Sequence, residues 1–297
     1  VQLAHQRLYQ LIFSPGVDVI KTEENPTLRR IYGNDILKRY HFFTNDFFGI
    51  DRTIMKIVRY FHAAAMQGEE SRQVLYLVGP VGAGKSSLME HLKRALESAP
   101  PIYAIKDCPM REEPLHLLPK HLREQFGKLL DVTIEGDLCP VCRYRLKNDY
   151  QGEYEKVPVE TVEFSIRSRK GIGSVDISKM DLYPEDDPRV LSLNGAFNVG
   201  NRGIVEFIEV FKNEIEYLHT MITATQEKSI PSPGKGSMIY FDGVILAHSN
   251  EAEWNKFKSD HTNEAILDRI VKIEVPYCLE LNEEIKIYQK LLKNSSF

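Results

Sequence analysis

QVLYLVGPVGAGKSSLMEHLKRALE, residues 73–97, is the stretch that decides the fold of this chain. Its first seven residues form a short apolar run that ends in glycine, which predicts a buried strand. Leu88, Leu92 and Leu96 recur at helical spacing and predict a helix over residues 86–97. A glycine-rich loop separates the two, so the predicted order is strand, loop, helix.

The loop itself, GPVGAGKS, fits the pattern G-x-x-x-x-G-K-[ST]. Its glycines let backbone N–H groups curl around phosphate oxygens, and the following helix adds its positive dipole end. Lys85 can reach the β- and γ-phosphates, and the Ser86 hydroxyl can ligate Mg²⁺. We therefore predict ATP and Mg²⁺ as cofactors, held by Gly79, Pro80, Val81, Gly82, Ala83, Gly84, Lys85, Ser86 and Ser87.

Outward from the loop, strands and helices alternate, which favours an α/β layer fold with a mostly parallel sheet. The alternation is interrupted by polar stretches with several Pro and Gly, which predict an insertion around residues 107–195. Residues 1–45 are predicted to be a helical lead-in. The pattern predicts helices over 51–66 and 213–228 and further strands over 102–106, 204–210, 236–250 and 271–277.

Composition narrows the class of protein. Of the 297 residues, 42% are hydrophobic and 27% charged, as in an ordinary globular protein. The net charge of −4 argues against non-specific nucleic-acid binding. Apolar runs fall short of the roughly 18 to 20 residues that a membrane helix needs.

Four cysteines are too few for a disulfide scaffold, so we expect a reducing cytoplasm. The start at Val1, without methionine, leads us to expect a piece of a longer protein.

A second motif, NRGIVEFIEV at residues 201–210, supplies acidic groups at the end of a strand. It resembles the Walker B segment of AAA+ ATPases, and the resemblance implies that Glu209 polarises the attacking water. Ile208 stands where that family carries a metal-side aspartate. Glu206, on the same strand face as Ile208, is a substitute for holding Mg²⁺. The alternative is that both glutamates are partly solvated residues at a strand end.

Further segments resemble AAA+ proteins in the same sequence order. The resemblance implies that Asn250, at the end of a strand, positions the attacking group near the γ-phosphate. It implies that Arg269, in ILDRI, reaches a neighbouring subunit's nucleotide, and that Gly49 and Ile50 contact adenine. The resemblance thus extends the predicted site from the phosphate loop to three more segments.

The stretches YAIKDCPMREEPLHLLP (103–119), EGDLCPVCRYRL (135–146), NVGNRGIVEFIEVFK (198–212) and HSNEAEW (248–254) together resemble the AAA domain of the PrkA family of serine protein kinases. This resemblance implies a P-loop NTPase three-layer αβα core of AAA+ type over residues 46–278. It also implies the first helix of a lid over 279–297.

The implied function is phosphorylation of a protein substrate with Mg²⁺-ATP by a homo-oligomer. Two alternatives stay open: an oligomeric ATPase that remodels or helps degrade proteins, and a nucleotide-gated scaffold with weak turnover. YAIK at residues 103–106 is similar to the V-A-I-K strand of eukaryotic protein kinases, but the H-R-D and D-F-G motifs are absent from the sequence. We therefore do not expect a kinase site of that type.

Cys139 and Cys142 have the two-residue spacing of a zinc half-site. His116 and His121 could complete such a site only if the fold brings them close. A redox pair and plain turn cysteines are the alternatives, and the sequence favours the last. The other two cysteines, Cys108 and Cys278, are predicted to be small buried hydrophobic residues.

Overall fold

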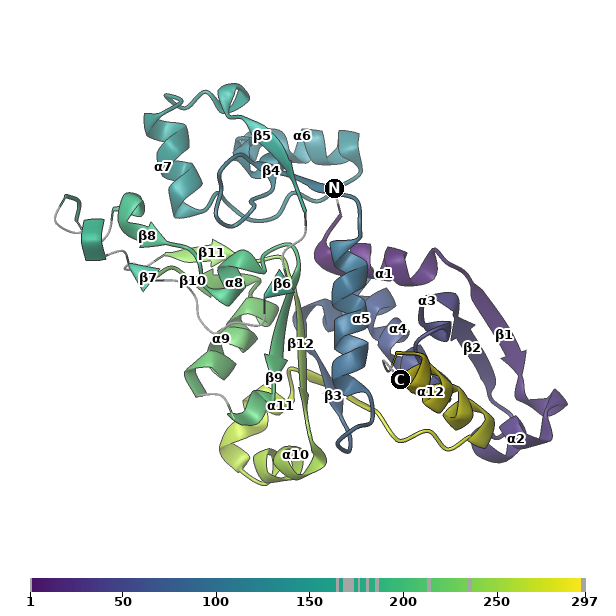
Figure 1. Cartoon of the computed structure of the whole chain (residues 1–297). Coiled ribbons are helices and arrows are strands. Elements are labelled where there is room, and N and C mark those ends of the chain that lie inside the picture. Colours follow the sequence, from purple (N-terminus) through teal and green to yellow (C-terminus); the bar gives the residue numbers. More distant parts are fainter. Residues whose placement is uncertain are drawn as a thin grey trace.

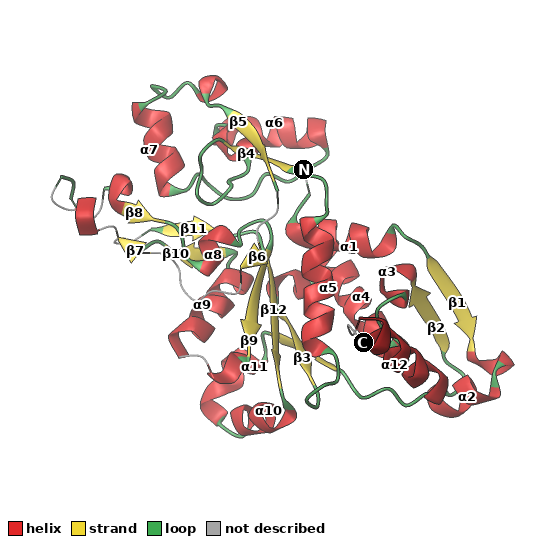
Figure 2. Ribbon diagram, in the orientation of Figure 1, coloured by secondary structure: helices red, strands yellow, loops and turns green. Residues whose placement is uncertain are grey.

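The computed structural model describes residues 2–163, 166–167, 174–175, 177–179, 182–184, 187–212, 215–233 and 237–294. At its centre is a five-stranded sheet in the order β13-β3-β12-β9-β6, in which all neighbouring strands run parallel (Figures 1 and 2). The strands are β3 (Val74–Val78), β6 (Ile166–Arg167), β9 (Ile204–Ile208), β12 (Val244–Ser249) and β13 (Ile270–Glu274).

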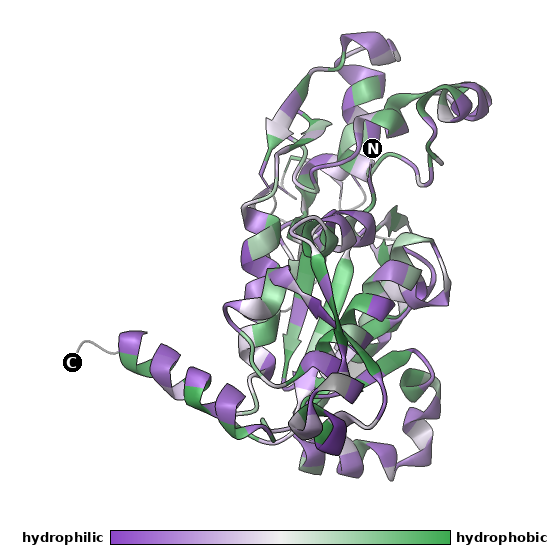
Figure 3. Cartoon of the chain, turned by 90° about the vertical axis from the view of Figure 1, so that its right-hand side faces the viewer, coloured by the Kyte–Doolittle hydropathy of each residue, from purple (hydrophilic) through white to green (hydrophobic). Residues whose placement is uncertain are grey.

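Helices cover both faces of this sheet. Leu75 and Leu77 point into one buried cluster, while Val74 and Tyr76 point into the other, as the period of two in a strand requires. The first face is covered by α1 (Ala4–Phe13), α4 (Asp51–Ala65) and α5 (Lys85–Glu97), and the second by α8 (Ala196–Val199) and α9 (Ile215–Gln226). Figure 3 shows the apolar strands enclosed between helices with polar outer faces. The predicted αβα fold class is confirmed.

The prediction of a core strand at residues 102–106 is wrong in its placement. β4 (Ile102–Ile105) forms, but it pairs antiparallel with β5 (Val159–Val162) in a separate two-stranded sheet. Its partner therefore comes from the insertion, and β6 takes the place beside β9. Local periodicity predicts a strand but not the sheet that it joins.

The single strand predicted over 236–250 is also wrong, because the chain bends within it. β11 (Met238–Tyr240) pairs with β10 (Ser229–Pro231), and β12 begins only at Val244. At the bend, a side chain on Gly243 would place its Cβ 2.4 Å from the ring of Phe241. Glycine at position 243 leaves room for this ring, so the chain can bend here before β12 begins.

The lead-in is not wholly helical. Between α1 and α4 lie β1 (Val17–Lys21) and β2 (Ile36–Tyr40), an antiparallel pair, with the short helices α2 (Pro26–Tyr32) and α3 (His41–Thr44) beside them. Leu8 and Ile12 of α1 are fully buried in the same cluster as the first face of the sheet.

Residues 102–162, which we call the insertion lobe, lie at the top of Figure 1. The lobe contains β4, β5, α6 (Lys120–Leu130) and α7 (Pro140–Asn148). Later in the predicted insertion come β7 (Ser174–Val175) and β8 (Leu191–Ser192), and part of that stretch lies outside the described residues.

The NRG segment that opens β9 ties this lobe to the core. Arg202 donates to Glu113 at 2.7 Å and to the carbonyl of Tyr103 at 2.6 Å. Asn201 donates to the carbonyl of Met110 at 2.9 Å.

α10 (Glu251–Lys258) and α11 (Glu264–Leu267) lie between β12 and β13, and α12 (Leu281–Asn294) follows β13. α12 projects from the body of the molecule in Figure 3. Within the part of the chain that the structure describes, every helix is too short or too polar to cross a bilayer.

Candidate nucleotide site

The glycine-rich loop joins β3 to α5 at the carboxyl edge of the sheet, and its glycines are required for different reasons. A Cβ on Gly79 would lie 2.2 Å from the carbonyl oxygen of Val275, so the neighbouring strand excludes any side chain there. Gly82 and Gly84 have φ of 82° and 88°, a conformation that is strained for other residues. The loop therefore has the open backbone that a phosphate cradle needs.

A cleft of about 1010 Å³ lies over this loop. Ile50, from the segment predicted to contact adenine, lines it, as do the hydroxyl-bearing Ser86 and Ser87. Gly49 instead packs behind the cleft, where its carbonyl accepts from the Tyr32 hydroxyl at 3.2 Å. Other lining residues come from the loop, the central strands and α12: Gly82, Ala83, Gly84, Glu206, Ile208, His248, Glu284, Ile287, Tyr288 and Leu291.

Lys85 is folded back onto its own loop. Its Nζ donates to the carbonyl oxygens of Gly79 at 2.7 Å and Pro80 at 2.6 Å, and burial lowers its pKa. The ammonium is thus hydrogen-bonded to two backbone carbonyls of its own loop. A phosphate in the loop would offer the same ammonium a charged acceptor at short reach.

Glu206 is the buried carboxylate of the cleft, with a side chain only 3% exposed. Its Oε2 accepts from Lys93 Nζ at 2.7 Å, and its Oε1 lies 3.7 Å from His248 Nε2. Among the described residues that nitrogen of His248 has no hydrogen-bond partner, and burial lowers the pKa of the imidazole, which favours the neutral ring.

Sequence reasoning missed both Lys93 and His248. A signal for His248 was available, because it stands two residues before Asn250 and so shares its strand face. Lys93 lies two turns beyond the loop on α5, and the sequence carries no sign that it pairs with a strand 113 residues away.

Ile208 lines the cleft on the same side as Glu206, as the strand period predicted, and is 54% exposed. The next residue, Glu209, has a left-handed φ of 48°, and its carboxylate lies 2.9 Å from Lys212 Nζ. Glu209 is not among the described residues that line the cleft. Its catalytic role stays a prediction.

Asn250 and Arg269 also lie outside the described lining of the cleft. The Asn250 Oδ1 accepts from the amide of Glu253 at 2.9 Å and caps α10. Arg269 is half-buried, and its Nε donates to Gln226 Oε1 at 3.1 Å. The structure thus places the phosphate loop, Ile50, Glu206 and Ile208 together in the cleft. Glu209 and Asn250 directly follow β9 and β12, whereas Arg269 precedes β13 and lies at the edge of the sheet opposite the phosphate loop.

α12 closes one side of the cleft with half-exposed and exposed side chains. Lys290 of this helix pairs with Asp46, and Tyr277, just before it, donates to the carbonyl of Val81 at 2.8 Å. Several apolar side chains of the helix remain exposed, with Leu281 and Leu292 each at 70%. The helix therefore forms one wall of the cleft.

Three of the four cysteines form a second polar site, which we call the thiol cluster: Cys108, Cys139 and Cys142. The Sγ atoms of Cys108 and Cys139 lie 4.0 Å apart, and the amide of Cys142 donates to Cys139 Sγ at 3.4 Å. Hydrogen bonds from the other two thiols lower the pKa of Cys108, whereas hydrogen bonds with Cys108 and Cys142, together with burial, raise the pKa of Cys139.

The prediction for Cys108 is confirmed and that for Cys278 is wrong. Cys108 is buried in the second apolar cluster, with the sulfur of Cys139 beside it. Cys278 is only half-buried, because it lines the nucleotide cleft. Of the two candidate histidines, His116 lies 3.3 Å from the Glu112 carboxylate next to the cluster, whereas His121 is exposed.

Comparison with known proteins agrees with this geometry. The family model described as the PrkA AAA domain matches residues 1–297. The chain is 36% identical over 318 residues to the ATP-dependent protease PrkA of Bacillus subtilis (strain 168), covering 99% of this chain and 48% of that protein. It is also 36% identical over 318 residues to the serine/threonine kinase YeaG of Escherichia coli (strain K12), covering 98% and 48%.

The chain thus spans about half the length of the curated relatives it matches. Among solved structures, a complex of the magnesium chelatase subunits BchI and BchD is similar in fold, with a TM-score of 0.50 at 14% identity, covering 86% of this chain and 67% of that one. The AAA+ fold is shared at a level of sequence identity that carries no information on substrate.

Proposed function

Because the chain belongs to the PrkA AAA domain family, we propose that it binds Mg²⁺-ATP in the cleft beneath α12 and transfers the γ-phosphate. The observation that carries this proposal is the meeting of a phosphate loop, Ser86 and the buried carboxylate of Glu206 in one cleft. In P-loop proteins these are the three elements that hold the phosphates and the metal ion.

In this mechanism the loop amides and Lys85 neutralise the phosphates. The ammonium would exchange the two carbonyls of its own loop for the β- and γ-phosphates. Ser86 Oγ and the Glu206 carboxylate, which Lys93 now pairs with, are the groups that would hold Mg²⁺, and the ion would supply charge neutralisation at the phosphates. Ile50 contacts the base, and α12 covers it.

We propose a protein serine as the first candidate acceptor. YeaG, at 36% identity, is named a serine/threonine kinase. Water is the second candidate, since PrkA is named an ATP-dependent protease and such proteins couple hydrolysis to work on a substrate.

Arg269 is proposed to complete the site of a neighbouring subunit. Its half-exposed guanidinium lies outside its own cleft, on the side of β3 and α9, and arginine fingers act in this way across an interface. The proposal therefore includes a homo-oligomer. Mixing tests it: with excess Arg269→Ala subunits, wild-type turnover per subunit should fall, and unchanged turnover would contradict the assignment.

A cytoplasmic location is part of the proposal, since ATP is supplied there and the four cysteines are free thiols.

The fate of the γ-phosphate tests the proposed function. The chain is incubated with Mg²⁺ and γ-labelled ATP over a range of protein concentrations, with Lys85→Ala as control. Label on serine that the control lacks supports the kinase. Free phosphate that rises more than linearly with concentration supports an oligomeric ATPase. Tight ATP binding without either product would contradict phosphoryl transfer and leave a nucleotide-gated scaffold.

A further inference from the structure

The thiol cluster has the dimensions of a metal site. The Sγ atoms of Cys108, Cys139 and Cys142 and one carboxylate oxygen of Glu112 all lie within 4.8 Å of one another, and all four residues are buried. In a tetrahedral zinc site with bonds of about 2.3 Å to sulfur, neighbouring ligand sulfurs lie roughly 3.8 Å apart. The 4.0 Å between Cys108 and Cys139 sulfurs is close to that spacing.

A disulfide does not account for the cluster. A bonded pair of sulfurs lies about 2.05 Å apart, whereas all three cysteines are free thiols. Three thiols also leave one sulfur over whichever pair is oxidised. Three sulfurs facing one point match the coordination of a soft metal ion better than any redox pair.

The carboxylate is held toward the sulfurs by its surroundings. Both oxygens of Glu112 accept from the amide of Cys139, at 2.8 and 3.0 Å, and Oε1 also lies 3.3 Å from His116 Nδ1. A buried carboxylate is costly unless a cation or strong donors compensate it. A histidine bonded to a ligating carboxylate is a common outer partner in metal sites, because it fixes the orientation of the ligand.

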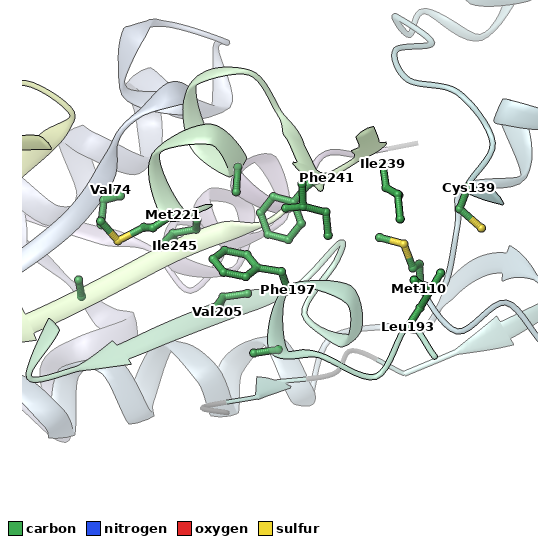
Figure 4. Close-up of a cluster of buried hydrophobic side chains, with 14 of the residues drawn as sticks. Val74, Met110, Cys139, Leu193, Phe197, Val205, Met221, Ile239, Phe241 and Ile245 are labelled. Atoms are coloured by element: carbon green, nitrogen blue, oxygen red, sulfur yellow. The ribbon is translucent and has the colours of Figure 1, made fainter. Parts of the chain in front are cut away.

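The cluster lies where the two helices of the insertion lobe contribute few buried side chains. In α6 the only buried residue is Gly127, and in α7 it is Cys142. Cys108, in the turn after β4, meets Cys139, the N-cap of α7, across 31 residues of chain. Figure 4 shows Cys139 at the far end of the buried cluster, beside Met110 and Leu193. Small units with a thin apolar core are often stapled by a metal ion.

We propose that Cys108, Cys139, Cys142 and Glu112 bind one structural Zn²⁺ that fixes α7 to β4 in the insertion lobe. Each thiol that ligates the ion releases its proton to solvent. None of these four residues lines the nucleotide cleft, so the site is separate from the proposed phosphoryl transfer.

The first test needs no mutation. The whole chain, purified without added metal and without chelator, is analysed for metal content, and about one zinc per chain is expected for a closed structural site. The same protein, stripped and refilled with Co²⁺, should show the thiolate-to-cobalt absorption and the intense visible bands of tetrahedral coordination. Less than a tenth of an equivalent of zinc and no cobalt spectrum would overturn the proposal.

Variants then identify the ligands. Cys108→Ser, Cys139→Ser and Cys142→Ser should each lower zinc affinity by at least about 100-fold, and Glu112→Gln by about 10- to 100-fold. Cys278→Ser is the matched control, since this thiol lies at the other site, and it should keep the zinc. ATP binding by each variant checks that the core has folded.

Three outcomes would contradict the assignment. Loss of zinc in Cys278→Ser would place the metal elsewhere. Loss in His116→Ala as large as in the cysteine variants would make the histidine the fourth ligand in place of Glu112. A mass lower by two hydrogens, with no metal, would reveal a disulfide within the cluster.

Discussion

In the nucleotide cleft the buried charges are already paired with other groups of the protein, whereas the thiol cluster gathers like groups that contact each other. Glu206 has Lys93 at 2.7 Å, and Lys85 has two carbonyl oxygens. The cluster brings three sulfurs and a carboxylate together. The buried groups of the cleft therefore already have partners, and nucleotide binding as proposed would exchange them. The cluster, by contrast, would be stabilised most by a permanently bound metal ion.

Glu206→Gln is the change that should separate the two sites most clearly. Removing the charge should lower phosphoryl transfer by about 100-fold, the usual effect of losing one electrostatic contact to a reacting group. ATP affinity and zinc content should stay within twofold. Turnover and metal analysis on the same preparation measure both.

Glu124→Gln serves as its control, because Glu124 is an exposed carboxylate that also pairs with a lysine. If Glu206→Gln and Glu124→Gln behaved alike, Glu206 would have no part in the reaction.

His5 is a buried titratable residue that has no partner of opposite charge among the described residues, so it tests how burial alone affects stability. Burial, helped by the charge of Lys228, lowers its pKa from 6.5 to about 3. The unfolded chain then binds a proton below pH 6.5 that the folded chain refuses, so stability falls as the pH drops. At pH 5 the loss should be about 2 kcal/mol relative to pH 7.

Urea unfolding at pH 7 and pH 5 measures this loss, and His5→Gln should remove that part of the pH dependence. The exposed His261 provides the comparison, since His261→Gln should leave the slope unchanged. Equal slopes for the wild type and His5→Gln would show that His5 titrates normally.

Ile208→Asp is the opposite change to Glu206→Gln, because it adds a negative charge to the cleft. Ile208 is 54% exposed, so the substitution should cost little stability. A carboxylate beside Glu206 should hold Mg²⁺ better and raise turnover by about tenfold, the effect of 1.4 kcal/mol in the barrier. Ile208→Asn has the same shape without the charge. A gain in the asparagine variant as large as in the aspartate variant would contradict the electrostatic explanation.

The nucleotide cleft was largely predictable because its main element is contiguous in sequence. The loop between β3 and α5 carries its own glycines, lysine and serine, and the strand period correctly placed Glu206 beside Ile208. The predictions for β4 and for the strand over 236–250 were wrong because pairing partners and bends depend on distant packing, here β5 and the ring of Phe241.

The thiol cluster could be predicted only in part, again because its members are distant in the sequence. The spacing of Cys139 and Cys142 indicated two ligands, but Cys108 is 31 residues away and looked like a plain apolar residue. The sequence also did not show that the NRG segment has a structural part. Asn201 and Arg202 attach the insertion lobe to the core through Met110 and Glu113.

By itself, the sequence determined that this protein has a phosphate loop between a buried strand and a helix. The conformation of such a short segment depends mainly on its own residues. Only the tertiary structure decided which strands share the sheet, that Lys93 neutralises Glu206, and that three cysteines meet one glutamate. Those contacts join residues tens of positions apart, and their free energy comes from burial and charge pairing that exist only once the chain has folded.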